Sequence, residues 1–248
     1  MRVTRLFLDQ PISTGLTLTI GDERAHYLGR VLRAKAGQTV ELFNGDGNVH
    51  LAEIEAIGRK EVTVLVQSTT QGLARSACDI RLLQAVSRNE KMDWVIQKAV
   101  ELGVAAIQPV HTKRSVMQLD EKRAGKRLLH WQAIAMNAAQ QCGRSELPDL
   151  HAPVSLDALA THKAADRLRL IAQPDADITL DQLDQNAVSM GQNIDLMIGP
   201  EGGFESGETA LLKEAGFLAF RFGERILRTE TAAISLITLL QYKFGDLG

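Results

Sequence analysis

The sequence predicts an α/β protein: a mostly parallel sheet with helices on both faces, preceded by a small β-barrel. From residue 78 onward, apolar runs suited to strands alternate with runs suited to helices, which is typical of a helix-covered parallel sheet. Before residue 72, alternating runs recur about every ten residues between Gly- and Asn-containing turns, as in small barrels. Two C-terminal loops, 198–204 and 222–232, each follow a strand-like run and precede a helix-like one, which predicts a ligand crevice at the sheet edge.

Residues 1–72 are expected to form the barrel domain. The turn Asn44–Gly47 separates two of its strands, and one short helix is expected over His26–Leu32. The polar stretch 67–77 is expected to be a linker to a second domain, 73–248. Runs that alternate apolar and polar residues predict half-buried strands at 16–20, 39–43, 49–57 and 61–66.

The second domain is expected to alternate strands and helices. Apolar residues of 90–102 share one helical face, and Gly103 follows the last turn, as at many helix ends. Ser155 is expected to cap a short helix over 155–160. The other expected helices are 122–142, 205–215 and 232–242, and the expected strands are 80–86, 105–110, 167–172, 195–198 and 217–222.

Composition narrows the classes of function. The two cysteines, Cys78 and Cys142, lie in unrelated contexts, and the six histidines never pair at the i, i+4 spacing of a zinc helix, so no metal is expected. The chain has no run of about 18 apolar residues and no signal-peptide pattern at Met1, so a cytoplasmic protein is expected. The formal net charge is −2, yet 75–127 holds eleven basic and six acidic residues, which suits a phosphate-facing surface as well as an ordinary solvated one.

The motifs of several common nucleotide and hydrolase sites are missing from the sequence. No G-x-G-x-x-G follows a first strand, which disfavours a Rossmann-type methyltransferase or dehydrogenase. No P-loop motif occurs, and no G-x-S-x-G elbow offers a hydrolase nucleophile.

The functional prediction rests on the two C-terminal loops, IGPEGGF (198–204) and FGERILRTETA (222–232). Glycine lets a ligand approach the main chain closely because no Cβ intervenes, although such a string also serves as an ordinary strand-to-helix turn. Together with further segments, the loops resemble the SPOUT class of RNA methyltransferases, and more narrowly the 16S rRNA (uracil(1498)-N(3))-methyltransferase family. Those segments are HYLGRVLR (26–33), NGDG (44–47), IQKAVELGV (96–104), KRS (113–115) and AAQQCGR (138–144).

The resemblance covers nearly the whole chain and implies a fold, a cofactor and a substrate. It implies a SPOUT-type sheet with a C-terminal trefoil knot, a PUA-like RNA-binding barrel, and a homodimer without a metal. It also implies S-adenosyl-L-methionine as cofactor and 16S rRNA of the small ribosomal subunit as partner. Phe222 stands where the family more often has leucine, which keeps an apolar wall. The implied cofactor-binding residues are Ala172, Ile198, Gly199, Pro200, Glu201, Gly202, Gly203, Phe222, Gly223, Ile226, Leu227, Arg228, Thr231 and Ala232.

Methyl transfer to uracil N3 requires the loss of a weakly acidic imide proton. The methyl donor is already activated, so positioning and charge stabilisation should dominate the catalysis. Arg225 and Arg228 are the catalytic candidates for stabilising negative charge on the uracil or for clamping a phosphate. Glu201 is a candidate base or a brace for its loop, and Glu230 is better explained as a first-turn residue that stabilises a helix dipole.

Basic residues of both domains are candidate RNA contacts, because arginine matches phosphate geometry well. The RNA-binding candidates are Arg2, Arg5, Arg24, Arg30, Arg33, Lys113 and Arg114. Two other functions stay open at this point. One is a SPOUT methyltransferase that acts on another rRNA or tRNA position. The other is a non-catalytic RNA-binding factor in ribosome assembly, which would have no use for the cofactor.

Overall fold

A computed structural model describes residues 3–115, 121–162, 164, 166–179, 182 and 193–248. The chain divides into two units, each packed mainly on itself. The N-terminal unit comprises Met1–Ala74 together with Ala139–Leu147, and the C-terminal unit comprises Arg75–Ala138 and Pro148–Gly248. The domain bounds expected from the sequence, 1–72 and 73–248, stay a proposal.

The N-terminal unit is built on a curled five-stranded sheet in the order β1-β3-β4-β5-β2. Strand β1 runs parallel to β3, and the other neighbours are antiparallel. Strands β1 and β2 are the two edges of the sheet, so the expected barrel is an open half-barrel. The strands are β1 (Thr4–Phe7), β2 (Thr17–Gly21), β3 (Thr39–Phe43), β4 (Asn48–Ile57) and β5 (Glu61–Gln71).

The inner face of this sheet holds the first core, which is made of alternating apolar residues. Irregularities of register in β4, at Leu51/Ala52 and Ile54/Ala56, accompany the curl of the sheet. The expected linker was wrong over 67–71, because β5 continues through these polar residues to Gln71. Threonine and serine suit an exposed strand end as readily as a loop, so composition misplaced the boundary.

The short helix of this unit begins earlier than expected and changes type. Helix α1 spans Asp22–His26, and a π-helical turn, η1, spans Tyr27–Val31 with Leu32 N–H donating to Tyr27 O at 2.9 Å. Leu28 is fully buried, so it fixes this segment against the sheet. Arg33, which follows the turn, has a φ of 53°, the left-handed region that residues other than glycine seldom adopt.

Arg5 ties the segment 139–147 into the N-terminal unit. Its guanidinium pairs with Glu41, donates to Arg144 O at 2.8 Å and to Ser145 Oγ at 2.9 Å, and lies 4.4 Å from the centre of the Phe43 ring. A guanidinium that is only 12% exposed and has these partners holds two distant stretches of chain together.

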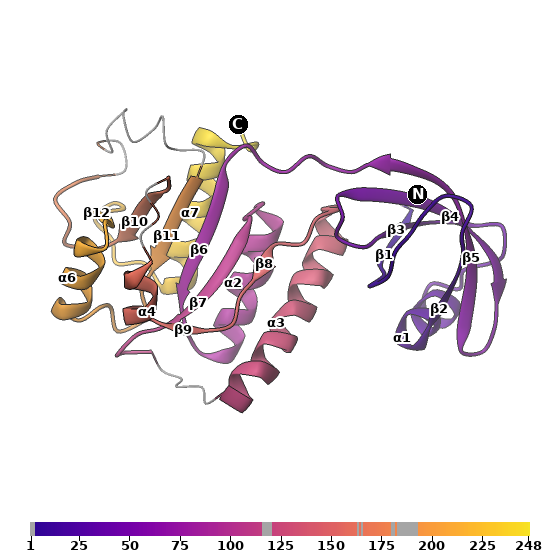
Figure 1. Ribbon diagram of the computed structural model, residues 1–248, viewed down its shortest axis with the longest axis horizontal. Coiled ribbons are helices and arrows are strands. Elements are labelled where there is room, and N and C mark those ends of the chain that lie inside the picture. Colours follow the sequence, from indigo (N-terminus) through magenta and orange to yellow (C-terminus); the bar gives the residue numbers. More distant parts are fainter. Residues whose placement is uncertain (1–2, 116–120, 163, 165, 180–181, 183–192) are drawn as a thin grey trace. The chain divides into compact units, whose positions relative to one another are not determined.

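The C-terminal unit contains a parallel sheet in the order β12-β10-β11-β6-β7-β8, with β9 also pairing with β7 (Figure 1). All of its ladders are parallel, which confirms the predicted parallel α/β fold. The strands are β6 (Asp79–Ala85), β7 (Ala106–His111), β8 (Asp149–Leu150), β9 (Val154–Ser155), β10 (Leu168–Ala172), β11 (Asn193–Ile198) and β12 (Leu218–Phe220).

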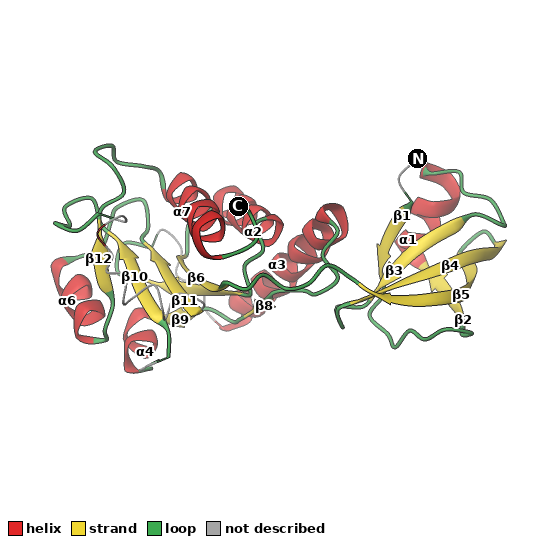
Figure 2. Cartoon of the chain, turned by 90° about the horizontal axis from the view of Figure 1, so that it is seen from above, coloured by secondary structure: helices red, strands yellow, loops and turns green. Residues whose placement is uncertain are grey.

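Helices cover both faces of this sheet, as Figure 2 shows. Helices α2 and α7 pack on each other and α7 packs on β6 and β11, whereas α4 and α6 pack together on the opposite face. Ser155 caps α4 as predicted, since its Oγ accepts from Ala158 N at 3.1 Å. The helices are α2 (Asn89–Glu101), α3 (Glu121–Cys142), α4 (Leu156–Thr161), α6 (Ser206–Glu214) and α7 (Thr229–Phe244).

Two sequence expectations concern the path of the whole chain. The trefoil knot depends on a path that includes 183–192, which lie outside the described residues, so it stays a prediction. Within the described ranges, no helix combines the length and the apolar character that crossing a membrane requires.

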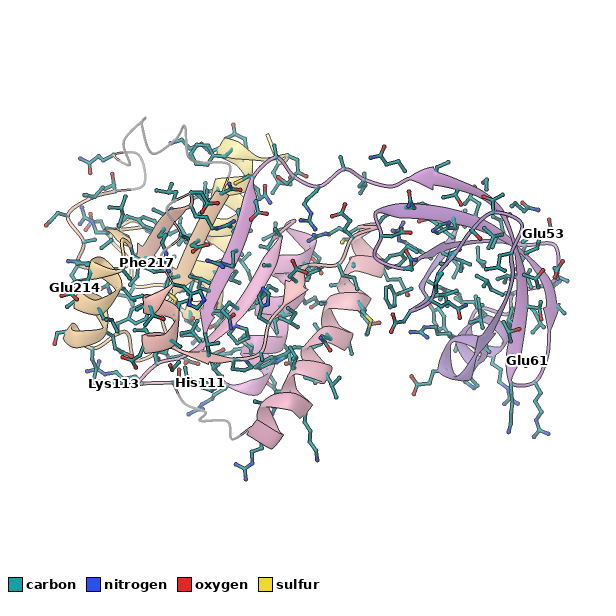
Figure 3. The ribbon with its side chains drawn as sticks, in the orientation of Figure 1. Glu53, Glu61, His111, Lys113, Glu214 and Phe217 are labelled. Atoms are coloured by element: carbon teal, nitrogen blue, oxygen red, sulfur yellow. The ribbon has the colours of Figure 1, made fainter. Side chains whose placement is uncertain are left out.

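A row of charged side chains crosses the middle of the parallel sheet. Asp195 of β11 faces Arg169 of β10 and Arg81 of β6 in register, and its carboxylate is fully buried. It accepts from Arg81 Nε at 2.9 Å and from Arg167 Nε at 2.6 Å, and Arg169 Nε lies at 3.4 Å. Arg169 also stacks on Phe217 at 4.0 Å, a ring that Figure 3 labels. One carboxylate therefore balances three guanidinium groups between adjacent strands.

Asp195→Asn keeps the shape of this side chain and removes its charge. The change leaves three guanidinium groups without their shared counter-charge, so we expect the free energy of unfolding to fall by about 3–5 kcal/mol. Urea denaturation followed by circular dichroism measures this. Asp79→Asn is the control, since the Asp79 side chain is 35% exposed and pairs with Arg167. Equal losses in the two variants would contradict the central role of Asp195.

Candidate active site

The loops that leave β10, β11 and β12 enclose a cavity of about 500 Å³ at the carboxyl ends of these strands. Its walls come from 172–175, from 198–204 and from 222–229, with Ala232 and Leu236 added by α7. Ligands of open α/β sheets bind at this edge. The volume suits a molecule of cofactor size, since such pockets span roughly 300–1,000 Å³.

The walls of the cavity combine an apolar part with an exposed rim. Ile198 and Leu236 are buried at 2% and 0% exposure. Phe222 and Leu227 are half-buried, and Ile226 on the rim is 85% exposed. This combination leaves an apolar surface for a flat ring and an isoleucine that only a ligand or a partner would cover.

Glycines shape the loop that follows β11. Gly203 N–H donates to Pro200 O at 2.9 Å, which closes a turn, and Gly203 has a φ of 69°. A Cβ on Gly199 would lie 2.7 Å from Cε2 of Phe204, so this glycine admits the phenyl ring against the main chain. The close approach at Gly199 is thus made by Phe204, a residue that itself lines the cavity and that sequence analysis did not select.

The hydroxyl of Thr229 connects two strand ends and the start of a helix behind the cavity. Thr229 Oγ1 donates to Gly199 O at 2.7 Å and accepts from Gln84 Nε2 at 3.0 Å. Thr229 is 5% exposed and Gln84 is fully buried, so water does not compete for these bonds. The ends of β6 and β11 and the start of α7 are therefore fixed to one another.

The loop after β12 presents two arginines at the cavity. Arg225 and Arg228 are both on its wall, and both are exposed. Gly223, with a φ of 71°, turns the loop, and Arg221 pairs with Glu224 at 3.0 Å. Arg228 occupies the N-cap position of α7, and as a residue with donors only it cannot cap the helix through its side chain.

Glu201 enters the cavity wall from the β11 loop and is held from outside by Lys91. Lys91 Nζ donates to Glu201 Oε1 at 2.9 Å and lies 3.6 Å from Glu230 Oε2. Burial raises the pKa of Glu201, but the hydrogen bond and charge of Lys91, a hydrogen bond from the main chain of Glu201 and the charge of Arg88 together outweigh it, so the pKa falls below its ordinary value. A carboxylate with a lowered pKa is a poor proton acceptor, which favours the brace over the base.

The cavity brings together most of the cofactor-binding residues predicted from the sequence, and also Arg225. Two of the predicted set are not on its wall: Gly202, whose carbonyl accepts from Arg114 Nη1 at 2.9 Å, and Thr231, which lies in the first turn of α7. The wall residues are Ala172, Ile198, Gly199, Pro200, Glu201, Gly203, Phe222, Gly223, Ile226, Leu227, Arg228 and Ala232.

Other residues of the wall and of its support were not predicted from the sequence. Gln173 is one: its main-chain N–H donates to Phe220 O at 2.9 Å and its Nε2 to Thr209 Oγ1 at 3.0 Å. Thr229 follows directly on the predicted Arg228 and begins α7, and a threonine at the start of a helix is a signal that the sequence offers. The missed wall residues are Gln173, Pro174, Asp175, Phe204, Thr229 and Leu236.

The predicted RNA contacts lie in both units. Arg24, Arg30 and Arg33 are exposed on or next to α1 and η1. Arg5 pairs with Glu41 and donates to the main-chain oxygen of Arg144 and to the hydroxyl of Ser145. Its contact with RNA stays a prediction. Arg2 lies outside the described residues.

Lys113 and Arg114 belong to the C-terminal unit, at the exit of β7, where Figure 3 labels Lys113. Lys113 Nζ lies 3.4 Å from Glu205 Oε2, and Lys113 N–H donates to Glu208 Oε1 at 2.8 Å. Glu208 also closes the capping box of α6 with Glu205, so this exit loop is joined to the helix that follows the β11 loop. Across the described ranges, no group of three or more side chains is arranged to hold a metal.

The sequence and the fold match a known class of proteins. A model of the RNA methyltransferase domain matches residues 74–241, and a model of the RNA methyltransferase PUA domain matches residues 20–67. The chain therefore belongs to the RNA methyltransferase family, in the branch that contains the proteins named ribosomal RNA small subunit methyltransferase E.

Particular relatives and structures are similar over nearly the whole chain. The methyltransferase E of Buchnera aphidicola from Schizaphis graminum is 31% identical over 99% of this chain and 98% of its own length. A putative methyltransferase of Legionella pneumophila, solved with bound SAM, has a TM-score of 0.92 and 37% identity over 100% of both chains. A methyltransferase E of Neisseria gonorrhoeae, bound to S-adenosyl methionine, has a TM-score of 0.90 and 32% identity over 100% of both chains.

Thr229→Val removes the hydroxyl that joins the strand ends and keeps the volume of the side chain. It removes the hydroxyl partner of Gly199 O and one of the two bonds of the Gln84 amide, which still donates to Ala85 O at 3.1 Å, so we expect a loss of about 1–3 kcal/mol in the free energy of unfolding. Urea denaturation measures the loss. Thr229→Ser retains the hydroxyl and should lose much less. If both substitutions cost the same, the hydroxyl bridge does not hold the loops.

Proposed function

We propose that this protein uses S-adenosyl-L-methionine to methylate 16S rRNA of the small ribosomal subunit at N3 of uracil 1498. The observation that supports the proposal is the cavity at the ends of β10, β11 and β12, whose walls combine the predicted glycine loops with apolar and charged side chains. Membership of the RNA methyltransferase family supports the reaction class. The names of the relatives support the small-subunit substrate. The uracil position comes from the resemblance of the sequence.

The residues on the wall fit the proposed cofactor in chemistry and in size. Ile198, Leu236 and the half-buried Leu227 form an apolar surface suited to an adenine ring. Gly199, Pro200 and Gly203 of the loop after β11 lie on the wall, and the main chain of such a loop suits the polar edge of the base. When bound, S-adenosylmethionine supplies an activated methyl group and needs no metal.

The catalytic work left to the chain is to position the uracil and to stabilise its charge. Loss of the N3 proton leaves negative charge on the uracil carbonyl oxygens. Arg225 and Arg228, both on the cavity wall, are the groups proposed to stabilise that charge or to grip the adjoining phosphate. Glu201, held by Lys91, keeps its negative charge and acts within the cofactor site.

The N-terminal half-barrel is proposed to be the RNA-binding module. Its family match to a PUA domain supports this role, as does the exposure of Arg24, Arg30 and Arg33 on one short segment. Lys113 and Arg114 are the proposed contacts of the other unit. We further propose a homodimer, as the resemblance implies, and a cytoplasmic location, where ribosomal subunits are made. Sedimentation equilibrium measures the oligomeric state.

Nucleoside analysis tests the proposed reaction. Small subunits from a strain that lacks the gene should gain 3-methyluridine when incubated with the purified protein and S-adenosylmethionine. Mass spectrometry of digested rRNA identifies the nucleoside, and fragment mapping locates it. A methylated ribose or a methylated tRNA would replace the proposed target by another one. A protein that binds subunits but neither binds nor consumes the cofactor would be an assembly factor.

Arg228→Ala should separate catalysis from cofactor binding. We expect S-adenosylmethionine affinity to stay nearly unchanged and methyl transfer to fall about a hundredfold, the scale on which one preorganised charge-stabilising group acts. Arg228→Lys should recover part of the rate, because an ammonium group lacks the planar fork of a guanidinium. Single-turnover methylation of small subunits with tritiated cofactor measures the rate. Wild-type turnover, or a loss explained by cofactor affinity alone, would leave Arg225 as the remaining candidate.

A further inference from the structure

The charged side chains at the cavity complement the charges of the proposed cofactor. The wall includes two carboxylates, Asp175 and Glu201, and two guanidinium groups, Arg225 and Arg228. At neutral pH, S-adenosylmethionine has a sulfonium cation, an α-ammonium cation and one carboxylate. The cofactor can therefore meet an opposite charge at each of its charged groups, provided that the carboxylates of the wall stay ionised.

Glu201 is the carboxylate that the fold holds in place. One of its oxygens, Oε1, accepts from Lys91 Nζ at 2.9 Å, and its side chain is 26% exposed. Asp175, by contrast, lies exposed in the loop after β10. A side chain fixed by a charged hydrogen bond loses less freedom when a ligand binds, so it is the better preorganised contact.

Lys91 reaches Glu201 from a different element and also faces Glu230. It belongs to α2, Glu201 to the β11 loop, and Glu230 to the first turn of α7, where Glu230 Oε2 lies 3.6 Å from Lys91 Nζ. Without a cation between them, two neighbouring carboxylates would favour protonation of one. Lys91 therefore lets Glu201 remain an anion at the cavity while it fixes the loop against two helices.

We infer that Lys91 is a positioning residue of the cofactor site, which holds the Glu201 carboxylate as a fixed anion facing a cation of the cofactor. This inference rests on the proposed function, since it assumes S-adenosylmethionine in the cavity. It assigns to Glu201 a part in binding the methyl donor rather than in removing the uracil proton. Lys91 acts through Glu201 and does not itself touch the ligand.

A double-mutant cycle in calorimetry tests the link between the two residues. Lys91→Met and Glu201→Gln should each weaken S-adenosylmethionine binding about tenfold, and the double variant should lose little more than either. Lys91→Arg should recover part of the affinity, because it restores a cation. Lys98→Met is the matched control: Lys98 lies on the same helix and pairs with Glu101 at 2.8 Å. An equal further loss on adding Lys91→Met to Glu201→Gln would overturn the inference.

Two analogues distinguish which cation Glu201 faces. S-adenosylhomocysteine lacks the sulfonium charge and keeps the ammonium group, and 5′-methylthioadenosine lacks both. If Glu201→Gln weakens S-adenosylmethionine alone, Glu201 faces the sulfonium. If Glu201→Gln weakens the binding of S-adenosylmethionine and of S-adenosylhomocysteine but not that of methylthioadenosine, Glu201 faces the ammonium group. Equal weakening of all three compounds would show that Glu201 meets no cation and would overturn the inference.

The pH dependence of binding gives a readout that a merely structural lysine would not change. Several charged groups surround Glu201. Lys91 lies on α2, Arg88 just before it and Glu230 on α7, and the cavity wall adds Asp175, Arg225 and Arg228. Lys91 lowers the pKa of Glu201, so in the wild type the Glu201 carboxylate stays ionised to a lower pH. S-adenosylmethionine binding that requires this anion should therefore persist to that lower pH. In Lys91→Met the pKa of Glu201 rises. As the pH is lowered, the affinity of this variant should therefore begin to fall at a higher pH than that of the wild type.

The pH titration covers the range in which circular dichroism shows both proteins folded, and Lys98→Met should follow the wild type. A Lys91→Met variant whose affinity is lower by the same factor at every pH would overturn the inference. A wild-type protein that binds no S-adenosylmethionine would overturn the proposed function and this inference with it. Wild-type binding with unchanged Lys91→Met affinity would overturn the inference alone.

Discussion

The bond network around the Thr229 hydroxyl is the constraint on which the candidate site depends. A parallel sheet brings its strand ends to one edge, but it does not fix the loops that leave them. Thr229 joins the main chain of the β11 loop to the start of α7, and Gln84 joins both to the end of β6. These bonds are buried, so the three segments keep their relative places without help from a ligand.

Helix α7 is fixed at its other end as well. Gln241 is fully buried; its Oε1 accepts from Ser76 Oγ at 2.7 Å, and its Nε2 donates to Gly103 O at 3.2 Å. The helix thus has polar anchors at both ends and apolar residues such as Leu236 between them. Buried polar groups that are fully bonded specify one arrangement of packed elements, which apolar packing alone would leave less defined.

The sequence predicted the central elements of the parallel sheet to within one or two residues, because long apolar runs and a clear helical period mark them. It missed β8 and β9, each two residues long, since so short a strand has no pattern to detect. It also missed the parallel pairing of β1 with β3, which local sequence does not encode. Strand pairing across distant segments is decided by packing, which periodicity does not report.

The candidate site, too, has a part that the sequence predicts and a part that it does not. Glycine and proline marked its loops, because those residues have a local conformational meaning. Gln84 and Lys91 went unnoticed: their partners lie 145 and 110 residues away, and a glutamine in a buried strand or a lysine on an amphipathic helix has an ordinary local explanation. Side chains that support a site from a distance are visible only once the strands are placed.

The composition of the N-terminal unit has a consequence for synthesis on the ribosome. Arg5 finds its partners at Arg144 and Ser145, the first of them 139 residues away. The half-barrel therefore cannot finish packing when its own five strands have emerged, and must wait until α3 has followed them. Contacts so distant along the chain slow folding. A gene fragment cut after β5 would encode an incomplete unit. The nascent chain likewise leaves Arg5 without its partners at Arg144 and Ser145 until translation has passed Ser145.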